Sequence, residues 1–424
     1  MEKLENSDKF YVKGGAPLFG SLEIGCAKNA YLPILAASLL CDGEVILKNL
    51  PSYLDIHNMI LTIESLGVKT KIKNNNVHIF PNSINKYEVS SEFSCKTRSS
   101  FFCLGAILGR FKKAKVAYPG GCEIGARPID LHLKGLEALN VKITDRHGYI
   151  SCEGKNMKGA TVHLDFPSVG ATENIMLAAV LTKGTTKIIN AAKEPEVVDL
   201  QNFLNQAGAK IKGAGSHTII IQGVSSLHSV EYLPIPDRII AGTYVIANAI
   251  CGGEIILKNT NSKHLTALLT KLDNNGCKFW NKNDKIIMQS KKSHRAIKKI
   301  ETMGFPGFPT DLQPQIVALL ATARGTSVLT ENLFETRFRY VNELIKMGAD
   351  IIIKDRNLII KGVPKLYGAE VFSHDLRGGA GLVLAALNAE GFTTIDNVLQ
   401  IMRGYANLEK DLACLGANIK RISE

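Results

Sequence analysis

Apolar and polar positions follow a pattern that recurs about every seventy residues. A run of small apolar residues, suited to a helix buried on most faces, precedes a glycine turn and a stretch rich in Val, Ile and Thr that is typical of a strand. Five such pairs are Leu32–Leu40 with Gly43–Leu47, Ile175–Leu181 with Gly184–Ile189, Tyr244–Ile250 with Gly253–Leu257, Ile316–Ala321 with Gly325–Leu329, and Leu382–Leu387 with Gly391–Ile395. Each pair predicts a buried helix followed by a strand.

A second, amphipathic helix in each repeat ends at a Gly or Asn. These six positions, spaced 68 to 73 residues apart, are Gly67, Asn140, Gly208, Gly276, Gly348 and Gly416. Gly and Asn tolerate the left-handed conformation that often ends a helix. Six repeats predict an α/β protein of two lobes, each with three repeats, buried helices inside and sheets outside. A solenoid is the alternative, although solenoid repeats usually run 20–50 residues.

The chain of 424 residues exceeds one typical hydrophobic core, which also favours two domains. We expect the boundary near Leu233–Asp237, where two prolines interrupt regular structure. The segment Met1–Lys9 is charged and lacks the apolar core of a signal peptide. The longest apolar stretches, Tyr31–Cys41 and Ile239–Gly253, are too short to span a membrane. We therefore expect a cytoplasmic protein without membrane insertion.

The formal net charge is +12, but basic residues are dispersed apart from Lys291–Lys292 and Lys298–Lys299. With a single tryptophan, a nucleic-acid binder is not favoured, and anionic small substrates remain open. Nine cysteines without a CxxC pair indicate reduced thiols, and ten histidines without an HxxxH pair give no support to a metal site. The chain has no phosphate-binding P-loop, strand-linked GxGxxG or GxSxG motif.

Three loops carry candidate chemistry. Lys28 and Asn29 stand where the first buried helix begins, a place that attracts anions; alternatively, they are a surface lysine and a capping amide. Cys122 lies among glycines in Tyr118–Asp130, with Arg127 close by. This setting can lower a thiol pKa, so we favour a reactive cysteine over a small residue in a hairpin.

The third segment is Gly304–Pro314, in which a stretch rich in Pro and Gly leads to Asp311. By itself this residue is better explained as a helix cap than as a general base held by a rigid loop. Four isolated arginines stand in turns or at the starts of elements: Arg98, Arg337, Arg377 and Arg403. Single arginines are usually solvated, yet several at equivalent places in repeats could converge on one phosphate or carboxylate.

Two longer segments, Gly14–Ala37 and Pro119–His132, resemble the UDP-N-acetylglucosamine 1-carboxyvinyltransferases, an enolpyruvyl transferase family. Shorter matches are Phe166–Thr172, Glu194–Glu196, Pro236–Arg238, Phe308–Gln313, Asp375–Arg377 and Arg403–Tyr405. The resemblance spans essentially the whole chain. It implies a two-lobed inside-out α/β barrel, with residues 28–235 in the first lobe and residues 1–27 and 236–424 in the second.

The resemblance implies transfer of the enolpyruvyl group of phosphoenolpyruvate to the 3′-hydroxyl of UDP-N-acetylglucosamine. Cys122 would donate a proton to the phosphoenolpyruvate methylene and could form a covalent thioketal with this substrate. Asp311 would accept the hydroxyl proton, and Lys28, Arg127 and Arg403 would hold the phosphate and carboxylate. The other implied substrate-binding residues are Asn29, Arg98, Pro128, Ile129, Asp130, Leu131, Ser168, Val169, Gly170, Leu333, Arg337 and Arg377. No metal, organic cofactor or nucleic acid is implied, and protein partners are left open.

Three departures from the family pattern lie outside the main catalytic set. Cys26 replaces a glycine, Phe166 replaces a lysine that contacts the diphosphate in some members, and Gly378–Gly379 are expected to loosen the helix start after Arg377. The related shikimate-pathway enolpyruvyl transferases lack the Cys122 loop. A non-catalytic paralogue that binds UDP-sugars is a further alternative, but it would not need to keep both Cys122 and Asp311.

Overall fold

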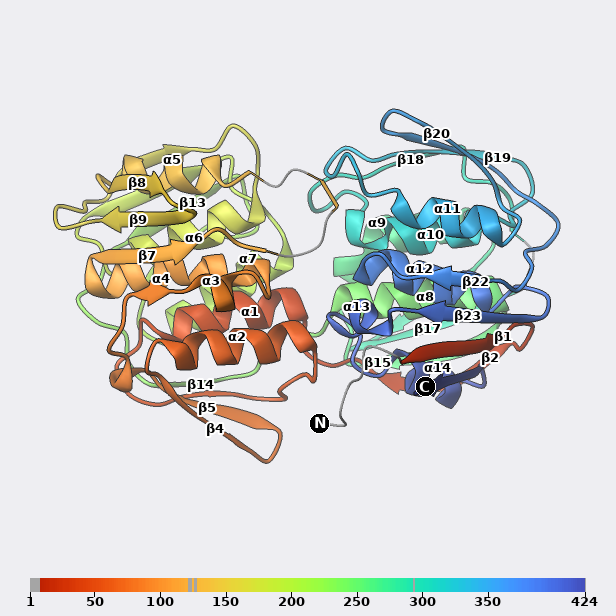
Figure 1. Ribbon diagram of the computed structural model, residues 1–424, viewed down its shortest axis with the longest axis horizontal. Coiled ribbons are helices and arrows are strands. Elements are labelled where there is room, and N and C mark those ends of the chain that lie inside the picture. Colours follow the sequence, from red (N-terminus) through yellow and green to blue (C-terminus); the bar gives the residue numbers. More distant parts are fainter. Residues whose placement is uncertain (1–7, 121–123, 126–127, 293, 424) are drawn as a thin grey trace. The chain divides into compact units, whose positions relative to one another are not determined.

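The computed structural model describes residues 8–120, 124–125, 128–292 and 294–423 of the chain. The chain divides into two compact units. Unit 1 comprises residues 1–25, 122–126 and 236–424, and unit 2 comprises residues 26–121 and 127–235. The amino-terminal strands therefore belong to the same unit as the carboxyl-terminal half of the chain (Figure 1).

Three buried helices form the centre of each unit. Those of unit 2 are α1 (Lys28–Ser38), α4 (Phe102–Phe111) and α6 (Val169–Ala179), and those of unit 1 are α8 (Arg238–Cys251), α10 (Gln313–Leu320) and α12 (Leu376–Ala386). Every residue of α12 is buried, as is every residue of α1 except Asn29. Five of these helices confirm the five predicted apolar runs. Close contact needs small residues, because a Cβ on Gly381 of α12 would lie 2.9 Å from the carbonyl of Pro314 in α10.

The sixth buried helix, α4, is absent from the predicted pairs. It leads into β7 (Lys113–Ala117) through Lys112, which has a φ of 57° where the other repeats have a glycine turn. The Lys112 ammonium donates hydrogen bonds to the carbonyls of Gly109 and Leu181, at 2.8 and 3.0 Å. The sixth copy of the pattern was missed because a lysine in the left-handed conformation takes the place of the expected glycine.

In the part of the chain that the structure describes, six four-stranded sheets surround these helices, three in each unit. Each sheet has one parallel and two antiparallel strand pairs. In unit 2 the orders are β14 (Val230–Tyr232), β3 (Val45–Leu47), β5 (Asn76–Phe80), β4 (Lys69–Lys73); β6 (Glu88–Val89), β7, β9 (Tyr149–Glu153), β8 (Lys142–Arg146); and β10 (Thr161–His163), β11 (Thr185–Ile189), β13 (Thr218–Gln222), β12 (Lys210–Lys212).

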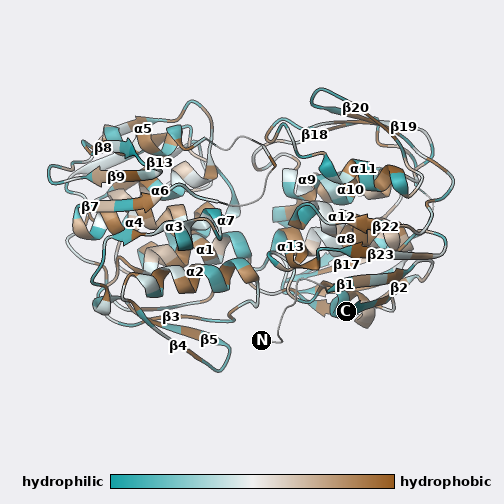
Figure 2. Ribbon diagram, viewed as in Figure 1, coloured by the Kyte–Doolittle hydropathy of each residue, from teal (hydrophilic) through white to brown (hydrophobic). Residues whose placement is uncertain are grey.

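In unit 1 the orders are β22 (Glu370–Phe372), β23 (Phe392–Asp396), β1 (Lys9–Lys13), β24 (Asn418–Ile422); β16 (Lys278–Lys282), β17 (Lys285–Ser290), β15 (Gly253–Lys258), β2 (Leu18–Glu23); and β18 (Lys299–Glu301), β19 (Thr326–Thr330), β21 (Asn357–Lys361), β20 (Asp350–Lys354). Hydropathy alternates along many of these strands (Figure 2), as expected for sheets with one buried face. In β5, for example, Val77 and Ile79 are buried and their neighbours are more exposed.

The amphipathic helices are α2 (Leu54–Ser65), α5 (Asp130–Ala138), α7 (Pro195–Gln206), α9 (Thr266–Asp273), α11 (Arg339–Lys346) and α14 (Leu408–Cys414). All six predicted turn residues after them have positive φ, between 65° and 104°, which confirms the left-handed helix ends. Shorter helical segments are η1 (Pro81–Ser83), α3 (Ser91–Ser94), η2 (Arg98–Phe101), η3 (Ser262–Leu265), η4 (Thr310–Leu312) and α13 (Val398–Met402). Within the described residues, no helix is long and apolar enough to cross a membrane.

Candidate functional site

Lys28 is the first residue of α1, and its side chain is buried. Its Nζ lies 3.0 Å from Oδ2 of Asp55, in the first turn of α2, and the two side chains are only 8% and 5% exposed. Burying two charges is favourable only if the pair is well made, so Asp55 fixes where this ammonium lies. Lys28 is therefore not the surface lysine of the alternative interpretation. Asn29, the next residue, is exposed.

The sequence analysis missed Asp55 because its partner is 27 residues away. Its only local signal is a carboxylate in the first turn of an amphipathic helix, a position that is favourable for the helix dipole alone. A conventional capping role would have been the natural explanation. The pairing with Lys28 depends on the packing of α1 against α2.

Asn174, in the middle of α6, joins three segments that carry predicted UDP-sugar residues. Its side-chain amide donates to the carbonyl of Phe101 at 3.0 Å and lies 3.0 Å from Nδ1 of His132, while its oxygen accepts from the N–H of Gly105 at 2.7 Å. Phe101 ends η2, which begins at Arg98, and His132 lies in the first turn of α5, beside Asp130 and Leu131. The structure thus joins η2, α5 and α6, the segments that carry these predicted residues, around one buried amide.

The start of α6 lies against the same histidine. A Cβ on Gly170 would lie 3.1 Å from the His132 ring, so a larger residue here would push the ring away. Ser168 caps the helix by accepting a hydrogen bond from the N–H of Ala171 at 3.3 Å, and Val169 is half-buried. Phe166, which replaces a cationic residue of some relatives, is 49% exposed. Asn174 gave only a faint sequence signal, as a polar residue inside the buried helix α6, and His132 gave none, because it lies on the amphipathic helix α5.

Asp311 in unit 1 is held from two sides by arginines. Its Oδ1 lies 2.9 Å from Nη2 of Arg337, and its Oδ2 lies 3.2 and 3.1 Å from Nε and Nη2 of Arg377. The carboxylate is 24% exposed, whereas both arginine side chains are 2% exposed. A planar guanidinium holds a carboxylate in a defined orientation, so the free direction of Asp311 is set by the protein.

The helix-cap interpretation of Asp311 is wrong. The N-cap of α10 is Leu312, and no side chain caps this helix. Asp311 instead lies inside the short helical turn η4, where its neighbour Thr310 supports Arg337 by accepting a hydrogen bond from Nη1 at 2.8 Å. The sequence alone favoured the cap because the two arginines are 26 and 66 residues away.

Each arginine rests on a second layer of buried polar groups. Thr310 donates to Glu331 at 2.8 Å, and Glu331 also accepts from the backbone N–H groups of Leu333 and Phe334, at 2.9 and 3.1 Å. The Arg377 guanidinium lies 5.2 Å from the ring centre of Tyr405. The Tyr405 hydroxyl is in turn 2.8 Å from Gln315 Nε2.

Electrostatics keep both arginines charged. Burial by itself lowers the pKa of Arg337, but Asp311, followed by Asp375 and Glu331, raises it more, and the net shift is upward. The pKa of Arg377 is also raised, because Asp311 and then Tyr405 and Asp237 outweigh burial. The Asp311 carboxylate therefore has two permanent cationic partners.

Glycines 378 and 379 tighten the start of α12, contrary to the expected loosening. A Cβ on Gly379 would lie 2.2 Å from Oγ of Ser373 and 2.6 Å from Ile401, and one on Gly378 would lie 2.6 Å from Asp375. Asp375 caps the helix through the N–H groups of Arg377 and Gly378, at 2.9 and 3.0 Å. The two glycines allow this close packing, which positions Arg377.

The remaining predicted residues are more dispersed. Arg403 is half-buried directly after α13, and its Nη1 lies 3.3 Å from Gln400. The N–H of Leu333 is already bonded to Glu331, as described above. In unit 2, Pro128 is exposed and Ile129 is buried at the start of α5. Cys122 and Arg127 lie outside the described residues.

Eight other cysteines are described, and none forms a disulfide. Burial raises the pKa of five thiols to about 12: Cys41, Cys103, Cys152, Cys251 and Cys277. Cys26 is also buried, and Cys95 and Cys414 are exposed. Among residues 8–120, 124–125, 128–292 and 294–423, no three His, Cys, Asp or Glu side chains gather as a metal site requires.

Comparison with known proteins places this geometry in a family. The sequence model of the EPSP synthase (3-phosphoshikimate 1-carboxyvinyltransferase) family matches residues 12–412. A UDP-N-acetylglucosamine 1-carboxyvinyltransferase 2 of Caldanaerobacter subterraneus is 49% identical, over 98% of this chain and 99% of its own length. The chain belongs to the UDP-N-acetylglucosamine 1-carboxyvinyltransferases.

Further relatives support the same family and fold. A UDP-N-acetylglucosamine 1-carboxyvinyltransferase of Thermotoga maritima is 46% identical, over 98% of this chain and 99% of its own length. Among solved structures, the enolpyruvyl transferase NikO of Streptomyces tendae matches with a TM-score of 0.88 at 23% identity, over 98% of this chain and 99% of its own. An EPSP synthase of Acinetobacter baumannii matches with a TM-score of 0.75 at 18% identity, over 98% of this chain and 100% of its own. These structural likenesses establish a mixed α/β enolpyruvyl transferase fold.

Proposed function

We propose that this transferase moves the enolpyruvyl group of phosphoenolpyruvate to the 3′-hydroxyl of UDP-N-acetylglucosamine and releases phosphate. The observation that carries the proposal is the 49% identity, across 98% of the chain, to a relative named for this transfer. In the cell this would be the first committed step of peptidoglycan synthesis, in the cytoplasm. The alternative of a non-catalytic UDP-sugar-binding paralogue is not favoured, because Lys28, Cys122, Asp311 and Arg403 are all present.

The reaction is an addition followed by an elimination. Asp311 accepts the proton of the sugar hydroxyl, whose oxygen forms a bond to the central carbon of phosphoenolpyruvate, while Cys122 donates a proton to the methylene carbon. The product of addition is a tetrahedral ketal. Loss of phosphate and of one methyl proton then restores the double bond. Cys122 can also add to the same carbon to form a thioketal.

The two arginines orient Asp311 for its proposed role as a base. Because Arg337 and Arg377 bond both of its oxygens, Asp311 is oriented before substrate binds and needs little rearrangement during proton transfer. In this proposal the two arginines act mainly by positioning Asp311, and they also add positive charge for the anionic substrates. Lys28, Arg127 and Arg403 bind the phosphate and carboxylate directly.

The UDP-sugar would be held by Asn29, by Arg98, by the start of α5 from Arg127 to Leu131, and by Ser168 to Gly170. Leu333 would contribute through its carbonyl, since its N–H is bonded to Glu331. The Asn174 network supports this assignment, because it holds η2, α5 and α6 together. Arg337 and Arg377 complete the set.

The fold belongs to the same proposal. Each lobe would be an inside-out α/β barrel of three repeats, with residues 28–235 forming the first lobe and residues 1–27 and 236–424 the second. Six four-stranded sheets, three in each unit, support this arrangement. By this division of the chain, Lys28, Cys122 and Arg127 belong to the first lobe and Asp311 and Arg403 to the second, so catalysis would require residues of both. The compact units differ from it at the Cys122 loop, because residues 124–125 are grouped with unit 1.

Phosphate release in a matrix of substrates tests the function. We expect release from phosphoenolpyruvate only when UDP-N-acetylglucosamine is added, and none with shikimate 3-phosphate as acceptor. Release with shikimate 3-phosphate would indicate the related shikimate-pathway activity. Binding of UDP-N-acetylglucosamine without any release would favour the non-catalytic paralogue.

Fosfomycin, an epoxide phosphonate that resembles phosphoenolpyruvate, tests the role of Cys122. We expect one adduct on Cys122 by mass spectrometry, an active and resistant Cys122→Asp variant, and an inactive Cys122→Ala variant. A Cys95→Ser/Cys414→Ser background removes the two exposed competing thiols and should leave inactivation unchanged. An adduct elsewhere, or inhibition that persists in Cys122→Asp, would exclude this role.

A further inference from the structure

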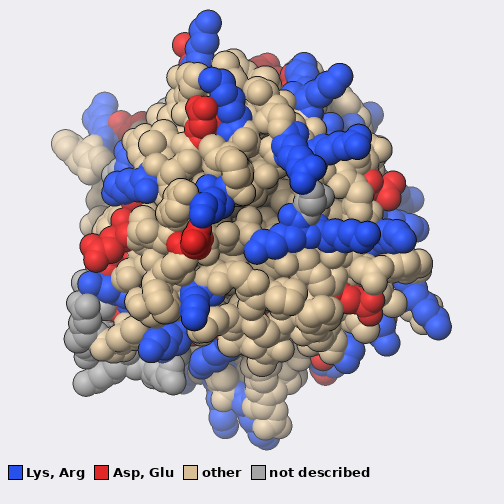
Figure 3. Space-filling view, turned by 90° about the vertical axis from the view of Figure 1, so that its right-hand side faces the viewer, with Lys and Arg blue, Asp and Glu red and all other residues tan. Residues whose placement is uncertain are grey.

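The positive charge of the molecule is concentrated in one stretch of unit 1. Residues 258–299 contain eleven Lys and Arg but only two Asp and Glu, which accounts for nine of the twelve net positive charges. Figure 3 shows the side of the molecule that lies on the right in Figure 1, where Lys and Arg side chains far outnumber acidic ones. This stretch includes strands β16 and β17 and the last residue of β15, all in the sheet β16-β17-β15-β2.

The register of this sheet arranges its outward side chains in rows that cross all four strands. One row runs Phe19, Glu254, Gln289, Lys278, and the next runs Ser21, Ile256, Ile287, Trp280. In the third row Glu23 lies opposite Lys258, and Lys285 lies opposite Lys282. The outer face therefore has aliphatic side chains at its centre and an aromatic side chain on each edge strand, with Lys258, Lys282 and Lys285 at one end and Lys278 at the other.

Six exposed lysines surround this face: Lys258, Lys278, Lys282, Lys285, Lys291 and Lys292. None of them forms an ion pair with a carboxylate in the described part of the chain. Other sheets differ, because Lys48 pairs with Glu231, Lys115 with Glu88 and Lys361 with Asp350 across neighbouring strands. Like charges directly opposite one another, as at Lys282 and Lys285, destabilise a sheet unless an anion lies between them.

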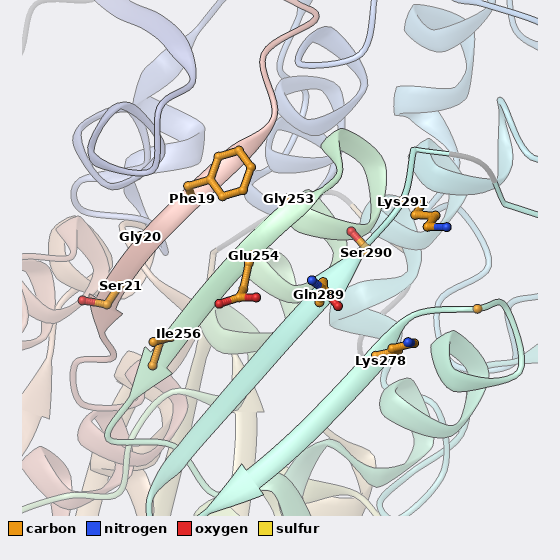
Figure 4. Close-up of a pocket in the computed structure, with 11 residues that line it drawn as sticks. Phe19, Gly20, Ser21, Gly253, Glu254, Ile256, Lys278, Gln289, Ser290 and Lys291 are labelled. Carbon is orange, nitrogen blue, oxygen red and sulfur yellow. The ribbon is translucent and has the colours of Figure 1, made fainter.

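A hollow of about 950 Å³ lies on the same face. Figure 4 shows Phe19, Glu254, Ile256 and Gln289 along it, with Lys278 and Lys291 at one side. Phe19 is 59% and Trp280 48% exposed, although aromatic residues of this size are usually well buried. Among the described residues, none of the proposed catalytic or substrate-binding set lines the hollow.

We propose that this face binds an acidic, extended segment of a partner protein that carries at least one apolar side chain. The lysines match its carboxylates, and the hollow beside Phe19 takes an apolar side chain, with Trp280 exposed in the neighbouring row of the same face. Four strands span roughly 14 Å, a distance that about five extended residues cover. A short peptide is therefore long enough to cross the sheet.

Other occupants fit less well. Single-stranded nucleic acid stacks on aromatics of central strands, but here the central strands present Glu254, Ile256, Ile287 and Gln289. A membrane surface is nearly flat, whereas this face is hollowed and has Glu254 within it. A second copy of the chain in a symmetric pair would place the same lysines against each other.

Trp280 reports directly on this face because it is the only tryptophan in the chain. We would titrate the full-length protein with a peptide of about eight alternating Glu and Leu residues, which contains no aromatic side chain. We expect a saturable blue shift of the Trp280 emission as a leucine covers the indole. Raising NaCl from about 0.02 M to about 0.5 M should weaken binding, because exposed charges are screened.

Charge removal tests whether the lysines are responsible. Lys278→Gln/Lys282→Gln/Lys285→Gln should bind the peptide at least about fivefold more weakly. The matched control is Lys69→Gln/Lys71→Gln/Lys73→Gln, which removes three exposed lysines from β4 in unit 2 and should bind like the wild type. Both variants should keep the wild-type rate of phosphate release, which shows that they fold.

Four outcomes would overturn the proposal. One is the absence of a shift with wild-type protein at low salt, and another is equal weakening in both triple variants. The other two are a larger emission shift with anionic phospholipid vesicles, or with a single-stranded oligonucleotide, at equal total anionic charge. Those results would assign the face to a membrane surface or to nucleic acid instead.

Discussion

Lys28 in unit 2 and Asp311 in unit 1 are both charged groups whose partner comes from another element, but they are held differently. Lys28 is a single ammonium on a flexible chain with Asp55 at 3.0 Å. Asp311 has each of its oxygens bonded to a different buried arginine. An ammonium can rotate from one acceptor to another, whereas a carboxylate between two planar guanidiniums cannot turn freely.

This difference suits the proposed roles. A cationic group that must bind an incoming phosphate should be able to exchange its existing ion pair for one with the phosphate. Lys28, whose ammonium pairs with Asp55, can do so. A base must meet one proton in one direction, and Arg337 and Arg377 fix that direction for Asp311. Substitutions at the two centres should therefore have different effects. A substitution of Asp311 should mainly lower turnover, and a substitution of Asp55 should mainly lower stability.

The largest effect is expected for Asp311→Asn. The amide keeps the size of the side chain but cannot accept the hydroxyl proton, so turnover should fall by about 10²- to 10⁴-fold while UDP-N-acetylglucosamine still binds. Steady-state phosphate release and calorimetric binding would measure this. Asp350→Asn, at an exposed carboxylate of β20, is the control and should match the wild type. Turnover within a few-fold of wild type would mean that Asp311 only organises the arginines.

A smaller loss is expected for Arg337→Lys. The charge is kept, but an ammonium cannot replace the guanidinium that bonds both Asp311 and Thr310, so Asp311 should lose its fixed direction. Turnover should fall roughly ten- to hundredfold, with a smaller change in the KM for UDP-N-acetylglucosamine. Arg356→Lys, at an arginine that bonds a backbone carbonyl on the surface, should be neutral. A rise in KM alone would identify Arg337 as a simple substrate ligand.

Asp55→Asn tests the other centre. It removes one negative charge beside a buried ammonium, so the free energy of unfolding should fall by about 2 kcal/mol. Turnover should stay within about tenfold of the wild type, because a bound substrate anion can replace Asp55 as the partner of the Lys28 ammonium. Denaturant unfolding would measure the first quantity, and Asp42→Asn, at a 61% exposed carboxylate, should cost less than about 0.5 kcal/mol. A turnover loss as large as that of Asp311→Asn would remove the distinction between the centres.

The smallest effect on turnover is expected for Asp199→Asn in unit 2. Asp199 accepts hydrogen bonds from Tyr232 at 2.6 Å and from the N–H of Ile235 at 3.1 Å, and the carbonyl of Ile235 bonds the N–H of Ala27, next to Lys28. Burial raises the pKa of Asp199 from 3.8 to about 6, despite the lowering effect of these hydrogen bonds. The folded protein therefore keeps this proton over a pH range in which the unfolded chain loses it.

The stabilising contribution of protonated Asp199 is complete below pH 3.8 and is lost as the pH rises to about 6. The difference between wild type and Asp199→Asn in unfolding free energy should change over this range by roughly 1–3 kcal/mol, with the wild type losing more as pH rises. Urea unfolding at several pH values would measure it. If the unfolding free energies of the two proteins changed with pH in parallel, the raised pKa of Asp199 would be contradicted. At neutral pH, the turnover of Asp199→Asn should nearly equal that of the wild type.

The repeat pattern could be predicted from the sequence because it depends on local preferences. Gly67, Gly208 and Gly416 have the positive φ expected at helix ends, and Asn140 follows the same rule. Runs of small apolar residues indicated the buried helices for the same reason. The pattern failed at Lys112, which adopts a left-handed conformation that its residue type seldom takes.

The charged centres could be predicted only in part. The candidate loops identified Lys28 and Asp311, and the resemblance suggested roles for them, but neither Asp55 nor Asn174 stood out. Their importance comes from partners 27 to 73 residues away. For Asp311 the local signal was misleading, since an acidic residue at the start of a helix is usually a cap.

Local sequence was thus enough to predict the period of the repeats, five of the six buried helices in the described part of the chain and the family, because all of these are encoded in short segments. The tertiary structure decided which distant side chains meet: Asp55 with Lys28, two arginines with Asp311, and the rows of lysine and aromatic side chains on the outer sheet. The physical reason is that backbone preference acts between neighbours in the chain, whereas charge pairing and strand register depend on packing between segments brought together only by folding.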